Sequence, residues 1–133
     1  MKNKNIKILL LIIAAVLLTL NLFQFNNNVS HNRLMDRLDL NLTSELDSLR
    51  LELERSSTPS ILAVEQASKI AALSTYSTLG FDYGYTLETR IHDKYVQNEP
   101  FKEMDQIQEL LLALLKDPAN QELQQRLDFL LVK

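Results

Sequence analysis

The sequence predicts an all-α protein, in which a single N-terminal transmembrane helix is followed by an amphipathic stalk helix and a small helical bundle. Three observations support this prediction. An apolar run lies near the amino terminus, leucines recur at helical spacing after it, and the 133 residues include only two glycines and three prolines. So few turn-forming residues favour helices over a strand-rich fold.

The composition divides the chain into four segments. Residues 1–7 form a short tail, residues 8–25 an apolar segment, residues 26–58 an amphipathic helix that is a stalk or a bundle member, and residues 59–133 the helical bundle. A chain of this length has room for one domain beyond the apolar segment.

Residues 8–25 are expected to cross a membrane as a signal anchor. The segment has no charged residue, and a helix of this length rises about 27 Å, close to the hydrocarbon thickness of a bilayer. Lys2, Lys4 and Lys7 precede it, so we expect the amino terminus in the cytoplasm and the C-terminal domain outside. The alternative is a secreted protein released by signal-peptide cleavage. No Ala-x-Ala pattern follows Leu20, which favours the uncleaved, single-pass protein.

The composition also argues against several kinds of chemistry. Residues 26–133 hold all 17 acidic residues but only 11 of the 14 lysines and arginines, which argues against a nucleic-acid surface. The chain has no cysteine, so disulfides, thiolate metal sites and cysteine nucleophiles are excluded.

The amphipathic helix carries one narrow apolar stripe, whose members are spaced three or four residues apart, as on one face of a helix. Two interpretations stay open: the stripe packs on its own bundle, which we favour, or it pairs with a partner helix or a second copy. Its 11-residue repeat permits only a nearly straight or slightly right-handed pairing. The stripe consists of Met35, Leu38, Leu42, Leu46, Leu49 and Leu53.

Residues that typically cap or break helices predict the ends of the remaining helices. Ser30, after three asparagines, is a candidate cap for the amphipathic helix. A helix over about 59–79 is expected to end at Gly80, and a shorter helix is expected over about 86–96. Further helices are expected to start at Asn98-Glu99-Pro100 and at Asp117-Pro118. The apolar run 110–115 predicts that the first of these two is the most buried helix of the bundle.

The segment from Tyr76 to Tyr85 has the most unusual composition, with both glycines and four of the nine aromatic residues. Phe81, Tyr83 and Tyr85 are therefore candidate contacts for a partner or a ligand, because tyrosine offers a large amphipathic surface at low entropic cost. The alternative is that these rings plug the end of the bundle, which we favour because a small domain needs its aromatic residues in its core.

No pattern predicts catalysis, a metal or a cofactor. The two histidines, His31 and His92, are far apart in the sequence, and no zinc-binding or activated-serine motif is present. The leading hypothesis is a non-enzymatic, membrane-anchored interaction module, which contacts lipid through residues 8–25 and binds another membrane or extracytoplasmic protein or itself. The alternative is an extracytoplasmic ligand-binding or sensing domain that uses the aromatic segment.

Overall fold

The computed structural model describes the backbone of residues 2–133 and the side chains of Ile6, Ile8 and every residue from Leu11 onward. Met1 and the side chains of Lys2, Lys4 and Lys7, on which the expected orientation depends, lie outside this description. Within residues 2–133 the chain forms five α-helices and no β-strand, which confirms the all-α class. The helices are α1 (Lys2–Arg55), α2 (Ile61–Ser74), α3 (Gly84–Gln97), α4 (Met104–Lys116) and α5 (Gln121–Val132).

The chain separates into two units, Met1–Leu34 and Met35–Lys133. In the first unit, α1 is the whole structure, and its helical backbone continues through Asn26–Ser30 without a break. The predicted helix start at Ser30 is therefore wrong. Asparagine lowers helix stability by only about 0.7 kcal/mol per residue relative to alanine, so three of them change the composition of a helix without ending it.

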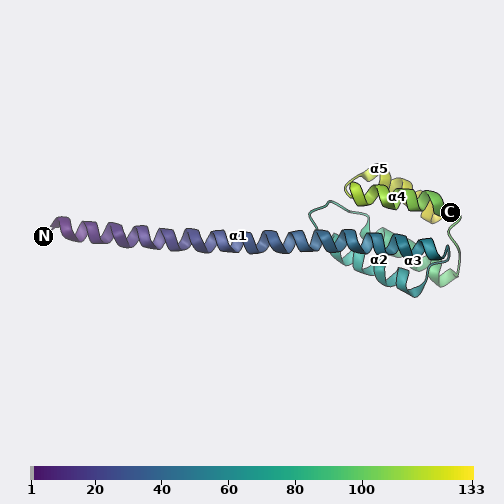
Figure 1. Cartoon of the computed structure of the whole chain (residues 1–133), viewed down its shortest axis with the longest axis horizontal. Coiled ribbons are helices and arrows are strands. Elements are labelled where there is room, and N and C mark those ends of the chain that lie inside the picture. The colour runs from purple at the N-terminus through teal and green to yellow at the C-terminus, as the bar shows by residue number, and fades with distance from the viewer. Residues whose placement is uncertain (1) are drawn as a thin grey trace. The chain divides into compact units, whose positions relative to one another are not determined.

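The second unit is a bundle with one hydrophobic core. In Figure 1 the α4–α5 hairpin lies on one side of the α1 residues of this unit and α2 on the other. Four leucines of α1 (Leu42, Leu46, Leu49 and Leu53) are fully buried in this core together with residues from all the other helices. A long apolar helix followed by a small helical bundle is thus the architecture that the sequence predicts.

Small residues bring α2 and α3 close together. Ala63, Ala67 and Ala71 recur every fourth residue on α2 and are all buried. Gly84, the first residue of α3, lies against the same helix: a Cβ there would be 2.2 Å from Ser74 Oγ and 3.1 Å from Ala71 Cα. No larger residue fits at that crossing without moving the two helices apart.

α2 ends at Ser74, well before the predicted stop at Gly80. The reason is a tertiary contact, since Asp39 on α1 accepts hydrogen bonds from Ser77 Oγ (2.6 Å) and from the backbone N–H of Thr78 (2.8 Å). The chain therefore turns toward α1 and does not continue as a helix. Gly80 does adopt a left-handed conformation (φ 69°), but in the loop and not at the helix end.

Two other predicted helix starts are also displaced. Asn98 ends α3 in a left-handed conformation, and α4 begins only at Met104, after the buried Phe101 has donated its N–H to Ser57 O (2.9 Å). The last helix begins after Asn120, whose side chain accepts a hydrogen bond from Leu123 N (3.2 Å), and not at Asp117-Pro118. The run 110–115 is also not buried all round, because Leu112 is exposed.

Candidate interaction surfaces

The aromatic segment is divided between core and surface. Phe81 and Tyr83 are buried, and their rings pack edge to face with centroids 6.3 Å apart. Tyr85 is 62% exposed, and among the described residues its hydroxyl accepts only one long hydrogen bond, from Thr75 Oγ1 (3.4 Å). Of the three candidate contacts, Tyr85 has the exposed ring, while Phe81 and Tyr83 pack into the core of the bundle.

Tyr83 also belongs to a polar cluster that connects α3 to α5. Its hydroxyl donates to Asp128 Oδ1 (2.9 Å), and Arg90 Nε donates to the same oxygen (2.8 Å). Burial and the adjacent Asp128 carboxylate raise the pKa of Tyr83, whereas the hydrogen bond from Arg90 lowers the pKa of Asp128. At neutral pH Tyr83 is therefore a hydrogen-bond donor and Asp128 an anion, and both stabilise the fold. Neither is poised to exchange a proton.

A hollow of about 350 Å³ lies beside this cluster. Its lining is polar and comes from the α2–α3 loop, α3 and α5. The lining residues are Asp82, Tyr83, Thr86, Gln121, Gln124, Gln125 and Asp128. Gln124 is committed to the fold, because its side-chain amide donates to Pro118 O (2.7 Å). The aromatic segment thus borders a concave surface through Tyr83, although its more exposed ring, that of Tyr85, does not line it.

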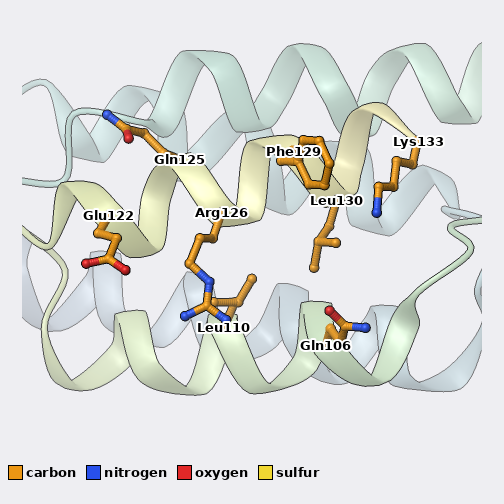
Figure 2. A pocket seen from close by; sticks show the side chains of 8 residues that line it. All are labelled: Gln106, Leu110, Glu122, Gln125, Arg126, Phe129, Leu130 and Lys133. Carbon is orange, nitrogen blue, oxygen red and sulfur yellow. The ribbon is translucent and has the colours of Figure 1, made fainter.

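A second hollow, of about 380 Å³, forms a groove between α4 and α5. Figure 2 shows Arg126, Leu130 and Lys133 extending from α5 toward α4, where Leu110 and Gln106 face them. Glu122, Gln125 and Phe129 complete the lining. The groove therefore combines apolar side chains with both cationic and acidic groups.

Phe129 is the most unusual residue of this groove. Its ring is 63% exposed, and Lys133 Nζ lies 4.4 Å from the ring centroid. The same ammonium also forms an ion pair with Glu103 Oε1 at 2.8 Å. Arg126 forms no ion pair within the described residues, although Glu122 lies four residues before it on the same helix. An exposed aromatic ring beside an unpaired guanidinium is typical of a contact surface.

The sequence does not predict this groove. Phe129 and Arg126 lie outside the face of α5 that carries its leucines. In the sequence they look like residues on an ordinary solvated helix face. A phenylalanine on such a face was the one available signal. This phenylalanine lines a groove only because α4 forms the opposite wall. The residue pattern of α5 alone does not show where α4 lies.

The apolar stripe of α1 is mostly buried. Leu42, Leu46, Leu49 and Leu53 are covered by the bundle, whereas Met35 and Leu38 are partly exposed. In this fold the four leucines pack against the rest of their own domain and present no surface to a partner helix.

Asp39, on the same stretch of α1, anchors the loop after α2. Its burial raises its pKa, but hydrogen bonds from Ser77 and Thr78 outweigh this effect, so that the pKa of Asp39 is lowered overall. His31 and His92 are both exposed. Within the described residues, no group of three or more His, Asp or Glu side chains is placed to hold a metal ion.

The apolar segment of the first unit is exposed from Leu11 to Phe25. Its large apolar side chains from Leu11 to Phe25 are 47–73% exposed. By length and composition, α1 is able to cross a membrane. No model of a known protein family matches the chain, and neither the curated proteins nor the solved structures contain a match to it.

Proposed function

We propose that this chain is a membrane-anchored, non-enzymatic protein–protein interaction module, with its helical domain on the extracytoplasmic side. The observation that carries the proposal is the exposed apolar surface of α1 between Leu11 and Phe25. The helix has no charged residue there, and only Thr19, Asn21 and Gln24 are polar. A surface of this composition is stable in hydrocarbon but not in water. A helix also satisfies its own backbone groups in lipid.

The polar groups of the domain support a binding role over catalysis. Tyr83, Arg90 and Asp128 satisfy one another, and Asp39 is held by the α2–α3 loop. A catalytic centre needs a nucleophile or a base within hydrogen-bond reach of its partner and of a space for substrate. The polar clusters described above hold segments of the fold together.

The α4–α5 groove is the surface that we assign to the partner. Phe129 offers an exposed apolar surface above the mostly buried Leu110 and Leu130. Arg126 supplies a cation that has no ion-pair partner among the described residues. Lys133 is already paired with Glu103, so Arg126 is the cation of the groove that is available to a carboxylate of a partner. We infer that it binds a segment of another membrane or extracytoplasmic protein that carries one large apolar side chain beside a carboxylate.

Anchoring and orientation are tested on membranes from cells that produce the full chain. The protein should remain in the membrane after alkaline extraction, and protease added to intact spheroplasts should digest the domain after Asn26. Release by alkali would contradict the anchor, and protection from external protease would contradict the orientation.

Partner binding is tested by a photoreactive amino acid placed at Phe129 in the full chain. A product heavier than the monomer should form from this position and should be lost in Arg126→Glu. The matched control is the same photoreactive group at Val96 on α3, which is 66% exposed and outside the groove. Equal yields from both positions, or no product from either, would contradict the proposal.

One observation also favours a second candidate function, the binding of a small polar ligand. The hollow that contains Tyr83 and Asp128 has side-chain amides and carboxylates around a space of about 350 Å³. Substituting Thr86→Trp fills this hollow from an exposed position. A polar metabolite that raises the melting temperature of the native chain but not of T86W would support this function, and identical responses would exclude the hollow as its site.

A further inference from the structure

Thr19 and Asn21, two polar residues within the apolar segment of α1, differ in how many of their side-chain hydrogen-bonding groups have a partner. Thr19 Oγ1 donates back to its own helix, to Val16 O (2.8 Å) and Ala15 O (3.0 Å). Asn21 Nδ2 donates one hydrogen to Leu17 O (2.9 Å), whereas its Oδ1 accepts no hydrogen bond from any residue in the described part of the chain. A carboxamide has two hydrogens and an acceptor oxygen, so Asn21 keeps one donor and one acceptor free.

The depth of Asn21 makes these free groups costly. Asn21 lies four residues before the end of the apolar segment at Phe25, so it is about 6 Å inside the hydrocarbon when that segment spans a bilayer. Water is scarce there, and an unpaired amide is strongly disfavoured in hydrocarbon. A hydrogen-bonding group of another helix at the same depth would pair with the free groups of Asn21 and so remove the cost of leaving them unpaired in hydrocarbon.

Asn21 also lies on a regular stripe. Ala14, Leu17, Asn21, Gln24 and Asn28 follow one another at intervals of three, four, three and four residues, which is the seam of a left-handed helix pair. These side chains are all exposed. Leu18, Leu22 and Phe25 border Asn21, Gln24 and Asn28 around a shallow hollow on this unit. Thr19 is two residues from Asn21 and therefore faces away from the stripe.

We propose that two copies of this chain pair in parallel within the membrane along the stripe Ala14–Asn28, with their Asn21 carboxamides hydrogen-bonded to each other. The inference rests on the proposed membrane span. A second copy in the same orientation places its own Asn21 at the same depth, and each carboxamide then donates to the other's Oδ1. An asparagine at one seam position also fixes the register of a two-helix pair.

The first test compares dimerisation of the full chain in phosphatidylcholine vesicles, measured by energy transfer between labelled copies. Asn21→Leu should weaken the dimer by about ten-fold, which is the effect of losing interhelical hydrogen bonds in a membrane. Thr19→Leu is the matched control and should leave dimerisation unchanged. Equal dimerisation by wild type and N21L, or equal weakening by N21L and T19L, would overturn the proposal.

The second test uses the absence of cysteine from the chain. Single variants Ala14→Cys, Leu17→Cys, Gln24→Cys and Asn28→Cys should form disulfide-linked dimers in native membranes, whereas Val16→Cys and Phe23→Cys on the opposite face should not. Crosslinking without this periodicity would overturn the pairing, and so would a product whose mass shows a different protein.

Alkaline extraction separates this inference from the proposed function. If the chain stays in the membrane but gives no dimer, only the paired helix is excluded. If the wild type is extracted by alkali, the anchor fails and the pairing fails with it.

Discussion

Leucine-rich stretches occur in both units of this molecule, in opposite surroundings. Large apolar side chains between Leu11 and Phe25 are 47–73% exposed, whereas Leu42, Leu46, Leu49 and Leu53 are 0–1% exposed. The difference follows from their distribution around the helix. A stripe on one face is covered by neighbouring helices, but a helix that is apolar all round needs an apolar medium on every side.

Polar side chains show the same contrast. In the bundle, Asp39, Gln124 and Asp128 each have a hydrogen-bond partner from another part of the chain. In the first unit, the hydrogen bond of Asn21 among the described residues is to its own helix, at Leu17 O. These three polar side chains of the bundle are therefore satisfied within the chain, whereas Asn21 keeps hydrogen-bonding groups that only its surroundings can satisfy. The free energy of unfolding of the bundle, measured on the full chain in detergent by urea denaturation, tests this comparison.

The largest effect is expected for Leu46→Ala. Leu46 is 0% exposed, and removing a buried leucine side chain costs about 2–5 kcal/mol through lost transfer free energy and a residual cavity. The control is Leu40→Ala on the same helix, where the side chain is 68% exposed and the change should be within about 0.5 kcal/mol. Equal losses at the two positions would contradict the assignment of the buried face.

A smaller loss, of about 1–3 kcal/mol, is expected for Gly84→Ala, because the new methyl group overpacks the α2–α3 crossing. The new Cβ would lie 2.2 Å from Ser74 Oγ and 2.9 Å from Ser74 Cβ. The variant Ser74→Gly lacks both of these atoms. The loss caused by G84A should therefore be smaller when it is introduced into S74G than when it is introduced into the native chain. Equal losses in the two backgrounds would show that the cost arises from the helix start and not from the crossing.

Tyr83→Phe and Tyr85→Phe form a matched pair within one segment. Y83F removes a buried hydroxyl that donates to the Asp128 carboxylate at 2.9 Å and should cost about 1–2 kcal/mol. Y85F removes an exposed hydroxyl with a 3.4 Å contact and should change stability by less than about 0.5 kcal/mol. A reversed order would show that the aromatic segment packs through the other ring.

The smallest effect is expected from acid. The pKa values of Asp39 and Asp128 are lowered in the fold, so each carboxylate stabilises the bundle above the ordinary aspartate pKa of about 3.9. This stabilisation is lost as the pH falls below that value toward the lowered pKa. Asp39→Asn and Asp128→Asn should each reduce the difference in unfolding free energy between pH 6 and pH 3. An unchanged difference in both variants would contradict the hydrogen bonds described for these groups.

Periodicity predicted the elements of the fold but not all of their ends. The leucine spacing of 38–53 and the positions of Leu87 and Ile91 reflect helix geometry, which each segment determines locally. The end of α2 at Ser74 was missed because Asp39, nearly forty residues away, holds Ser77 and Thr78. The start of α4 was missed because Phe101 packs into the core and bonds to Ser57 before the helix begins.

The candidate contacts were predicted only in part. Composition identified the aromatic segment, but not which of its rings is buried, because three rings within five residues give no periodic signal. The groove beside Phe129 and Arg126 needed the relative placement of two helices.

The sequence by itself determined the all-α class, the apolar segment and the apolar stripe of α1, since these depend on residue type and spacing along one helix. It also determined that an asparagine lies within the apolar segment. Only the tertiary structure decided which of Tyr83 and Tyr85 is accessible, where α2 ends and where a groove forms. These features depend on side chains that are far apart in the chain and meet only when the bundle closes.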